Sequence, residues 1–139
     1  MGRRYRYTSN EEENIIWNVA LYVRLSVEDG DKVESNSVVN QKQLLNDYLN
    51  ENTNFNLYDY YVDDGYSGTD FERPAFKRLL DDMKDKKFNT IIVKDLSRLG
   101  RNYIEVGNYI EQIFPLFNIR FIAINDNIDS YSGPSSVNN

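Results

Sequence analysis

A phenol, a guanidinium and a hydroxyl follow one another at intervals of two residues near the start of the chain, as Tyr22, Arg24 and Ser26. If residues 17–25 form a strand, side-chain alternation places these three groups on one face and the intervening apolar residues on the other. A strand buried on both faces would instead show a nearly continuous run of Val, Ile and Leu. The polar groups at the end of this strand therefore indicate a site rather than a core.

Two more arginines lie where a helix is expected to begin. Arg98 and Arg101 lie three residues apart at the expected start of a helix, where they would share a face beside free backbone N–H groups. With Arg24 and Arg73 they would surround the hydroxyl of Ser26 with guanidinium groups. Arginine matches phosphate oxygens and stays protonated, and phosphoryl transfer depends mainly on positioning and charge stabilisation. The set therefore fits attack on a phosphodiester better than attack on an amide.

Each of these residues also has an ordinary structural explanation. Alone, Ser26 would be a turn or cap residue, and Ser97 is a predicted helix N-cap. Arginines at a helix start more often form surface ion pairs, and Asp63 and Asp64 alone would be turn residues. Only their joint placement at one edge of a sheet favours a functional site.

The composition excludes several kinds of functional site. The chain has 139 residues with neither Cys nor His, which excludes disulfides, thiolate sites, Ser-His-Asp triads and His-based zinc sites. The length suits one domain, and no segment is predicted to cross or bind a membrane. The net charge of −6 predicts that this chain alone binds DNA weakly.

The hydrophobic pattern predicts alternating strands and helices. Strands are expected at residues 17–25, 55–62, 90–93 and 119–124. Helices are expected at residues 41–50, 74–83 and 98–117, whereas 1–16 are expected to form a mobile arm and 126–139 no regular element. This order is typical of an α/β domain with a mainly parallel sheet of four or five strands flanked by helices.

The polar segments converge in such a fold. Sites in parallel sheets form beyond the carboxyl ends of the strands. Residues 24–26, 64–73 and 94–101 each follow a predicted strand, so we expect them to meet at one edge of the sheet.

Four motifs in this order resemble a known family. They are Tyr-x-Arg-x-Ser at 22–26, the helix opening at 37–41, Asp64 to Gly68 followed by Arg73, and Asp-Leu-Ser-Arg-Leu-Gly-Arg at 95–101. From Val19 onward the chain resembles the catalytic domain of the serine site-specific recombinases of the resolvase and invertase superfamily. It is most similar to the large recombinases, which include integrases and transposases.

The resemblance implies a role for each matching residue. Ser26 would attack a DNA phosphate to form a 5′-phosphoserine bond and release a 3′ hydroxyl. Arg24, Arg98 and Arg101 would bind that phosphate, with Arg73 in support. The residues implied to line or support the site are Tyr22, Gln41, Asp64, Lys84 and Ser97. Ser97 stands where small resolvases usually carry Asp, and Asp95 lies two residues earlier, a pattern tolerated in the large branch.

The resemblance also carries expectations about the whole protein. Residues 17–139 would be a catalytic domain that stops before a long dimerisation helix and DNA-binding domains. The full-length protein would act on DNA recombination sites as a homodimer and a synaptic tetramer, for integration, excision or transposition of a mobile element. It would need no cofactor and would work in the cytoplasm of a bacterium, with a bacterial or phage gene.

Two other functions remain open from the residues alone. One is a phosphate- or nucleotide-binding α/β module without covalent chemistry, against which the absence of a Gly-x-Gly-x-x-Gly or Walker-type loop counts. The other is a protein-interaction domain that only oligomerises.

Overall fold

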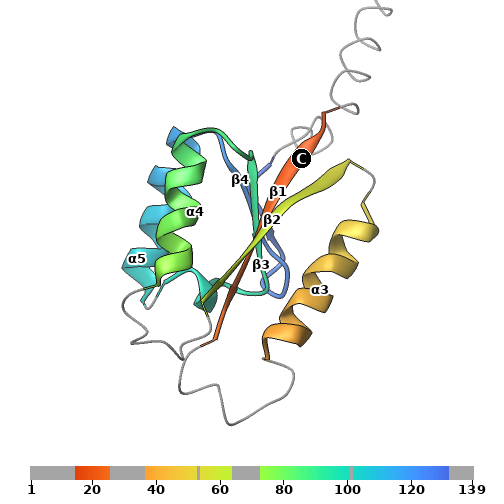
Figure 1. The fold of residues 1–139 in the computed structure, drawn as a ribbon. Helices are drawn as coiled ribbons and strands as arrows, with labels where there is room; N and C mark the ends of the chain where they lie inside the picture. Colours follow the sequence, from red (N-terminus) through yellow and green to blue (C-terminus); the bar gives the residue numbers. More distant parts are fainter. Residues whose placement is uncertain (1–14, 26–36, 53, 64–72, 101, 132–139) are drawn as a thin grey trace, which may run out of the picture.

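The computed structural model describes residues 15–25, 37–52, 54–63, 73–100 and 102–131. Five strands form one sheet in the order β2-β1-β3-β4-β5 (Figure 1). Their bounds are β1 Trp17–Arg24, β2 Phe55–Asp63, β3 Thr90–Val93, β4 Arg120–Ala123 and β5 Ile128–Asp129. The first four strands are parallel, and β5 pairs antiparallel with β4. The predicted fold class is confirmed.

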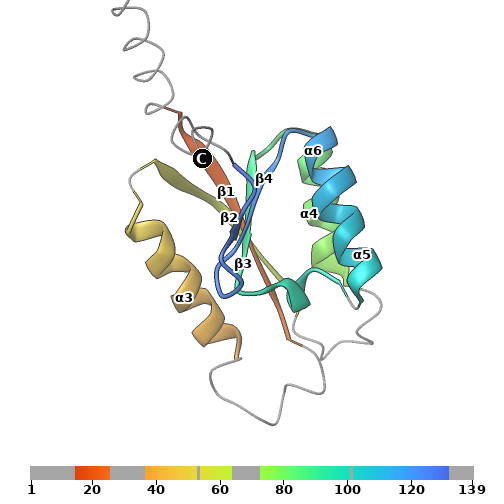
Figure 2. The same cartoon turned by 180° about the vertical axis from the view of Figure 1, so that it is seen from behind.

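Helices cover both faces of the sheet. Their bounds are α3 Val38–Asn50, α4 Pro74–Lys84, α5 Tyr103–Asn108 and α6 Phe114–Leu116, with a 3₁₀ turn η2 at Leu96–Arg98 and a π-helical turn η3 at Tyr109–Ile113. Figures 1 and 2 show α3 on one side of the sheet and α4, α5 and α6 on the other. No helix in the described ranges is both long and apolar enough to span a membrane.

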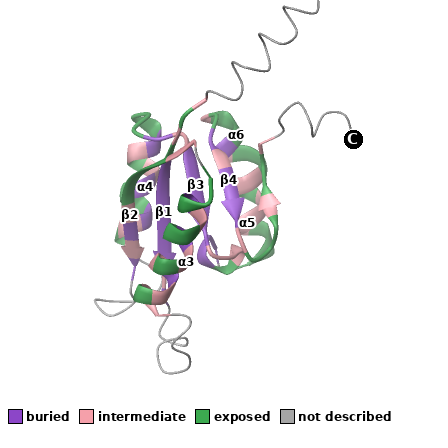
Figure 3. Ribbon diagram, turned by 90° about the vertical axis from the view of Figure 1, so that its right-hand side faces the viewer, coloured by how far each residue is buried: buried purple, intermediate pink, exposed green. Residues whose placement is uncertain are grey.

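Alternation along β1 divides the core into two layers. Ala20 and Tyr22 pack on the side of α4, with residues such as Phe76, whereas Leu21 and Val23 pack on the side of α3. All four of these β1 residues are fully buried, and β1, β3 and β4 form the purple centre of Figure 3. The central strands are therefore buried on both faces, as the apolar part of the pattern predicts.

The helix predicted at 98–117 begins later than expected. Asp95, not Ser97, is the cap of the first short turn, because its carboxylate accepts a hydrogen bond from the Ser97 N–H at 3.0 Å. That turn ends at Arg98, and the longer helix starts at Tyr103 with Asn102 as its N-cap. The prediction of Ser97 as N-cap was wrong because two competing caps, Asp95 and Asn102, split the segment.

Two other boundaries also differ from prediction. The first helix begins at Val38 rather than Gln41, because the Ser37 side chain accepts a hydrogen bond from the Asn40 N–H at 3.1 Å. Residues 128–129 form a strand where none was expected. Asn127 adopts a left-handed conformation (φ 55°) that turns the chain back along β4.

Candidate active site

The carboxyl ends of β1 and β3 lie side by side because these strands are parallel neighbours. Arg24 ends β1, and Arg98 belongs to the η2 turn that follows β3. The guanidinium of Arg24 donates to the Ser97 carbonyl oxygen at 2.8 Å, and the guanidinium of Arg98 donates to the Arg24 carbonyl oxygen at 2.7 Å. This reciprocal pair brings together two of the arginines that the sequence placed in one site.

Gln41 ties a third element to the same point. It lies in the first turns of α3, is fully buried, and donates from Nε2 to the Arg24 carbonyl oxygen at 3.2 Å. That carbonyl thus receives hydrogen bonds from both Gln41 and Arg98. The end of β1 is held from α3 on one side and from η2 on the other.

Arg73 approaches from the start of α4. Its guanidinium lies 4.0 Å from the centre of the Phe76 ring and donates to the carbonyl oxygens of Leu99 at 2.8 Å and Arg98 at 3.2 Å. Arg73 also has a left-handed backbone conformation (φ 41°), which is unfavourable for a residue with a Cβ atom. Strain of this kind persists only where surrounding contacts hold it.

Asp95, the acidic residue of the last motif, forms an ion pair with Arg98. The Asp95 carboxylate lies 3.4 Å from Nε of Arg98 and also accepts hydrogen bonds from the backbone N–H and the hydroxyl of Ser97. Side chains of Arg98 and Asp95 are only 6% and 22% exposed, so water screens this ion pair weakly. Asp95 therefore provides the carboxylate partner of Arg98 from two residues before Ser97.

Asp63 is a supporting residue that the sequence reasoning treated only as a turn residue. Its carboxylate accepts hydrogen bonds from the Tyr22 hydroxyl at 2.7 Å and from the backbone N–H groups of Ala75 at 2.9 Å and Phe76 at 3.0 Å. It thus caps α4 from the end of β2, while the residue before the helix, Arg73, makes no side-chain cap. The sequence did contain a signal for this role of Asp63. A helix that begins at Pro74 has no capping side chain directly before it, so the cap must come from another part of the chain.

Burial keeps the Tyr22 phenol neutral. Burial is the main cause that raises its pKa; the charge of Arg73 opposes the rise, the charge and hydrogen bond of Asp63 add to it, and Arg24 lowers the pKa slightly. A neutral phenol donates a hydrogen bond to Asp63 and cannot act as the base for Ser26. Tyr22 thus contacts the same carboxylate that caps the start of α4.

The remaining predicted residues have different positions. Ser26, Asp64 and Arg101 lie outside the described residues. Lys84 is exposed at the last position of α4, about 15 Å along the helix from the end that carries Arg73. The structure therefore does not bring Lys84 to the arginine cluster. In the ranges described, no group of three acidic side chains is arranged to hold a metal ion.

Gly100 allows the loop between η2 and α5 to pass close to the helix. A Cβ atom at this position would lie 3.0 Å from a carboxylate oxygen of Glu105 and 3.1 Å from a methyl group of Val106. Both distances are shorter than usual Cβ contacts, so a larger residue at this position would require the Glu105 and Val106 side chains to shift by a few tenths of an ångström.

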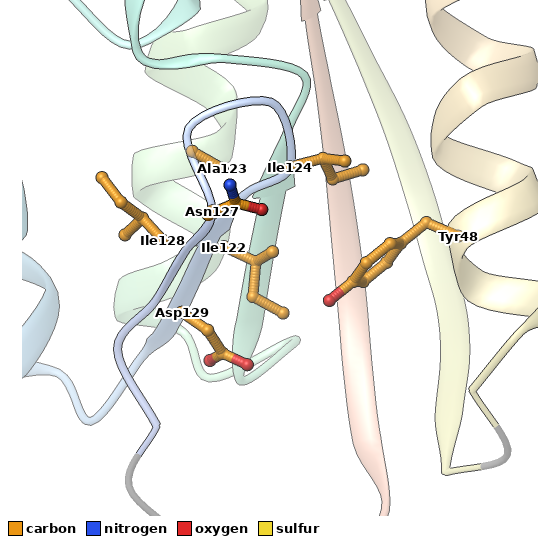
Figure 4. A pocket seen from close by; sticks show the side chains of 7 residues that line it. All are labelled: Tyr48, Ile122, Ala123, Ile124, Asn127, Ile128 and Asp129. Carbon is orange, nitrogen blue, oxygen red and sulfur yellow. The ribbon is translucent and has the colours of Figure 1, made fainter.

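A pocket of about 280 Å³ lies on the α3 side of the sheet. Figure 4 shows the phenol of Tyr48 directed toward Ile122 of β4. The remaining lining residues are Ala123, Ile124, Asn127, Ile128 and Asp129. Because neither Arg24 nor Arg98 lines it, this pocket is separate from the arginine cluster.

Known proteins match both the sequence and the structure. A family model described as the N-terminal domain of resolvase matches residues 19–136. The crystal structure of the N-terminal catalytic domain of TP901-1 integrase has a TM-score of 0.72 and 32% identity, and the match covers 86% of each chain. A resolvase family site-specific recombinase from Streptococcus pneumoniae has a TM-score of 0.69 and 27% identity, over 88% of this chain and 81% of that chain.

A phage protein matches part of the sequence. Uncharacterized immunity region protein 3 of Bacillus phage phi105 is 36% identical over 69 residues, which cover 50% of this chain and 82% of the relative. The longer family match includes all four motifs that carried the resemblance. The chain belongs to the resolvase N-terminal domain family and is a serine recombinase catalytic domain.

Proposed function

We propose that this chain cleaves and rejoins DNA at recombination sites, with Ser26 as the nucleophile. Attack forms a bond from Ser26 Oγ to phosphorus and breaks the bond from phosphorus to the 3′ oxygen of the DNA. The serine hydroxyl loses its proton, and the 3′ oxygen gains one. The phosphoserine ester keeps the energy of the broken bond, so the reverse attack by a 3′ hydroxyl rejoins the strands.

The observation that carries this proposal is the pair of hydrogen bonds that joins the end of β1 to η2, from Arg24 to the Ser97 carbonyl oxygen and from Arg98 to the Arg24 carbonyl oxygen. It places two guanidinium groups at the end of β1, two residues before Ser26. Preorganised positive charge stabilises the charge that develops on a phosphate during transfer. The buried Nε of Arg24 has no hydrogen-bond partner within the described part of the chain, so this guanidinium keeps an unused donor at the end of β1.

The family match favours this activity over a nucleotide-binding module without covalent chemistry. Within the proposal, Arg101 binds the phosphate together with Arg24 and Arg98, and Arg73 assists them. Tyr22, Gln41, Asp64 and Ser97 support the site. The DNA partner, the dimer and the synaptic tetramer belong to the same proposal. The reaction would serve integration, excision or transposition of a mobile element.

The test is a covalent adduct with DNA. We expect the full-length protein, incubated with its recombination site, to form a protein–DNA adduct that denaturing electrophoresis detects and that Ser26→Ala abolishes. Ser130→Ala is the control. Ser130 follows β5, its Oγ accepts a hydrogen bond from the Phe121 N–H, and it lies away from Arg24 and Arg98. Equal adduct in wild type and Ser26→Ala would refute the assignment of the nucleophile.

A further inference from the structure

Residues 103–116 form one run of helical turns that is interrupted by a π turn at Tyr109–Ile113. The Phe114 N–H donates to the Tyr109 carbonyl oxygen, five residues earlier, instead of four as in an α-helix. One extra residue in a turn rotates the two flanking parts of a helix by about 100° relative to each other. Turns of this kind often occur at functional sites.

The π turn sets the position of the Tyr109 ring. This half-buried ring lies edge-on to Phe76 of α4, with centroids 5.2 Å apart, and stacks against Phe114, with centroids 5.8 Å apart. Phe76 is the same ring on which the Arg73 guanidinium rests. Tyr109 and Arg73 therefore share one aromatic partner.

Burial is the main cause that raises the pKa of Tyr109, so the phenol is neutral at physiological pH. The charge of the nearby Arg73 guanidinium opposes this rise, so the phenol and the guanidinium lie within reach of each other's electrostatic influence. Arg73 is thus held by the Phe76 ring and by the carbonyl oxygens of Arg98 and Leu99, and Tyr109 packs against the same ring.

We propose that Tyr109, placed by the π turn against Phe76, is a positioning residue that fixes Arg73 on the backbone of Arg98 and Leu99. The η2 turn ends there, so fixing these carbonyl groups also fixes the backbone that carries the Arg98 side chain. The strained backbone of Arg73 needs such external contacts to keep its conformation. This role rests on the proposed recombinase function, because its consequence is the rate of DNA cleavage.

A matched tyrosine makes the test specific. Tyr61 is a fully buried tyrosine, its hydroxyl donates to Asp82 at 2.7 Å, and the Arg78 guanidinium lies 4.2 Å from the centre of its ring. Tyr109→Phe and Tyr61→Phe each remove one phenol hydroxyl that has an arginine nearby. Of these two tyrosines, only Tyr109 packs against Phe76, the ring on which Arg73 rests.

With full-length protein and its recombination site, we expect Tyr109→Phe to slow adduct formation about three- to tenfold, because the Arg73 guanidinium loses a polar neighbour, without a change in DNA affinity. Tyr61→Phe should cleave at the wild-type rate. In an Arg73→Gln background, Tyr109→Phe should slow cleavage no further. Equal rates for the two Phe variants, or an equal loss of affinity and rate in Tyr109→Phe, would overturn the proposal.

A second measurement does not depend on catalysis. Amide hydrogen exchange of Arg98 and Leu99 in the 139-residue chain should become faster in Tyr109→Phe and stay unchanged in Tyr61→Phe. Unchanged exchange in both variants would overturn the positioning role. A wild-type protein that forms no adduct would instead overturn the proposed function, and the exchange result would still decide the role of Tyr109.

Discussion

Arg98 is only 5% exposed, although it belongs to the group proposed to meet a DNA phosphate. Its charge is held between the Asp95 carboxylate and the Arg24 carbonyl oxygen. An arginine fixed in this way loses little conformational freedom when it acts, and its planar group can contact two oxygens at once. Lysine carries the same charge but cannot reproduce that geometry.

Arg98→Lys should therefore separate charge from geometry. We expect cleavage of the recombination site to slow by at least about a hundredfold, with DNA affinity within a few-fold of wild type. The measurements are the rate of adduct formation and binding by mobility shift. Arg78→Lys is the control, because Arg78 is half exposed and pairs with Asp59 at 3.7 Å. A loss of affinity as large as the loss of rate would assign Arg98 to docking alone.

Among the helices, α4 depends on a cap that comes from another element. Asp63 at the end of β2 receives the first N–H groups of the helix and the Tyr22 hydroxyl. Arg24 and Asp63 are partners in the register of β1 and β2, so the cap is built into the sheet. This arrangement places the start of α4, and with it Arg73, at the edge of the sheet where the other arginines lie.

Removal of that cap should lower the stability of the fold. We expect Asp63→Ala to lower the free energy of unfolding by ~1–3 kcal/mol, because three buried or partly buried donors lose their acceptor. Asp63→Asn, which keeps one acceptor oxygen, should lose less. Urea unfolding of the 139-residue chain measures both. Asp59→Ala is the control, since that side chain is 53% exposed, and an equal loss there would refute the capping role.

At the scale of the whole molecule, the two ends of the sheet differ. The parallel strands begin at the end of the sheet opposite Arg24 and Arg98. At this end the Arg120 guanidinium lies 4.8 Å from the ring centre of Trp17 and 5.1 Å from that of Phe55. Arg120 also binds both carboxylate oxygens of Asp129, at 2.9 and 2.6 Å. This end joins β1, β2, β4 and β5.

Because the two ends of the sheet differ, a substitution at the Arg120 end should lower stability without changing the rate of DNA cleavage. Arg120→Ala should lower the free energy of unfolding by ~1–2 kcal/mol, because a partly exposed ion pair and several ring contacts are lost. The rate of adduct formation by the folded full-length protein should remain that of wild type. Urea unfolding and the adduct assay measure these effects at a temperature where the variant is folded. Slower cleavage would show that the two ends are coupled.

Local patterns in the sequence were sufficient for much of this molecule. Apolar runs and helical spacing predicted the four parallel strands and the helices α3 and α4, because burial of an apolar face has a period that a short segment already shows. Parallel strands end at one edge, so the same pattern predicted that Arg24, Arg73 and Arg98 would meet there. The four motifs also indicated the family, which the match over residues 19–136 confirms.

Only the tertiary structure decided how those residues are held. The Asp63 cap, the carbonyl partners of the arginines and the pairing of β5 join residues that are distant in the chain, so no local period records them. The competition between Asp95, Ser97 and Asn102 as caps depended on neighbours such as Asp126, which accepts a hydrogen bond from the Leu96 N–H. The π turn that places Tyr109 against Phe76 was likewise not predictable, because hydrophobic spacing alone predicts a continuous α-helix there.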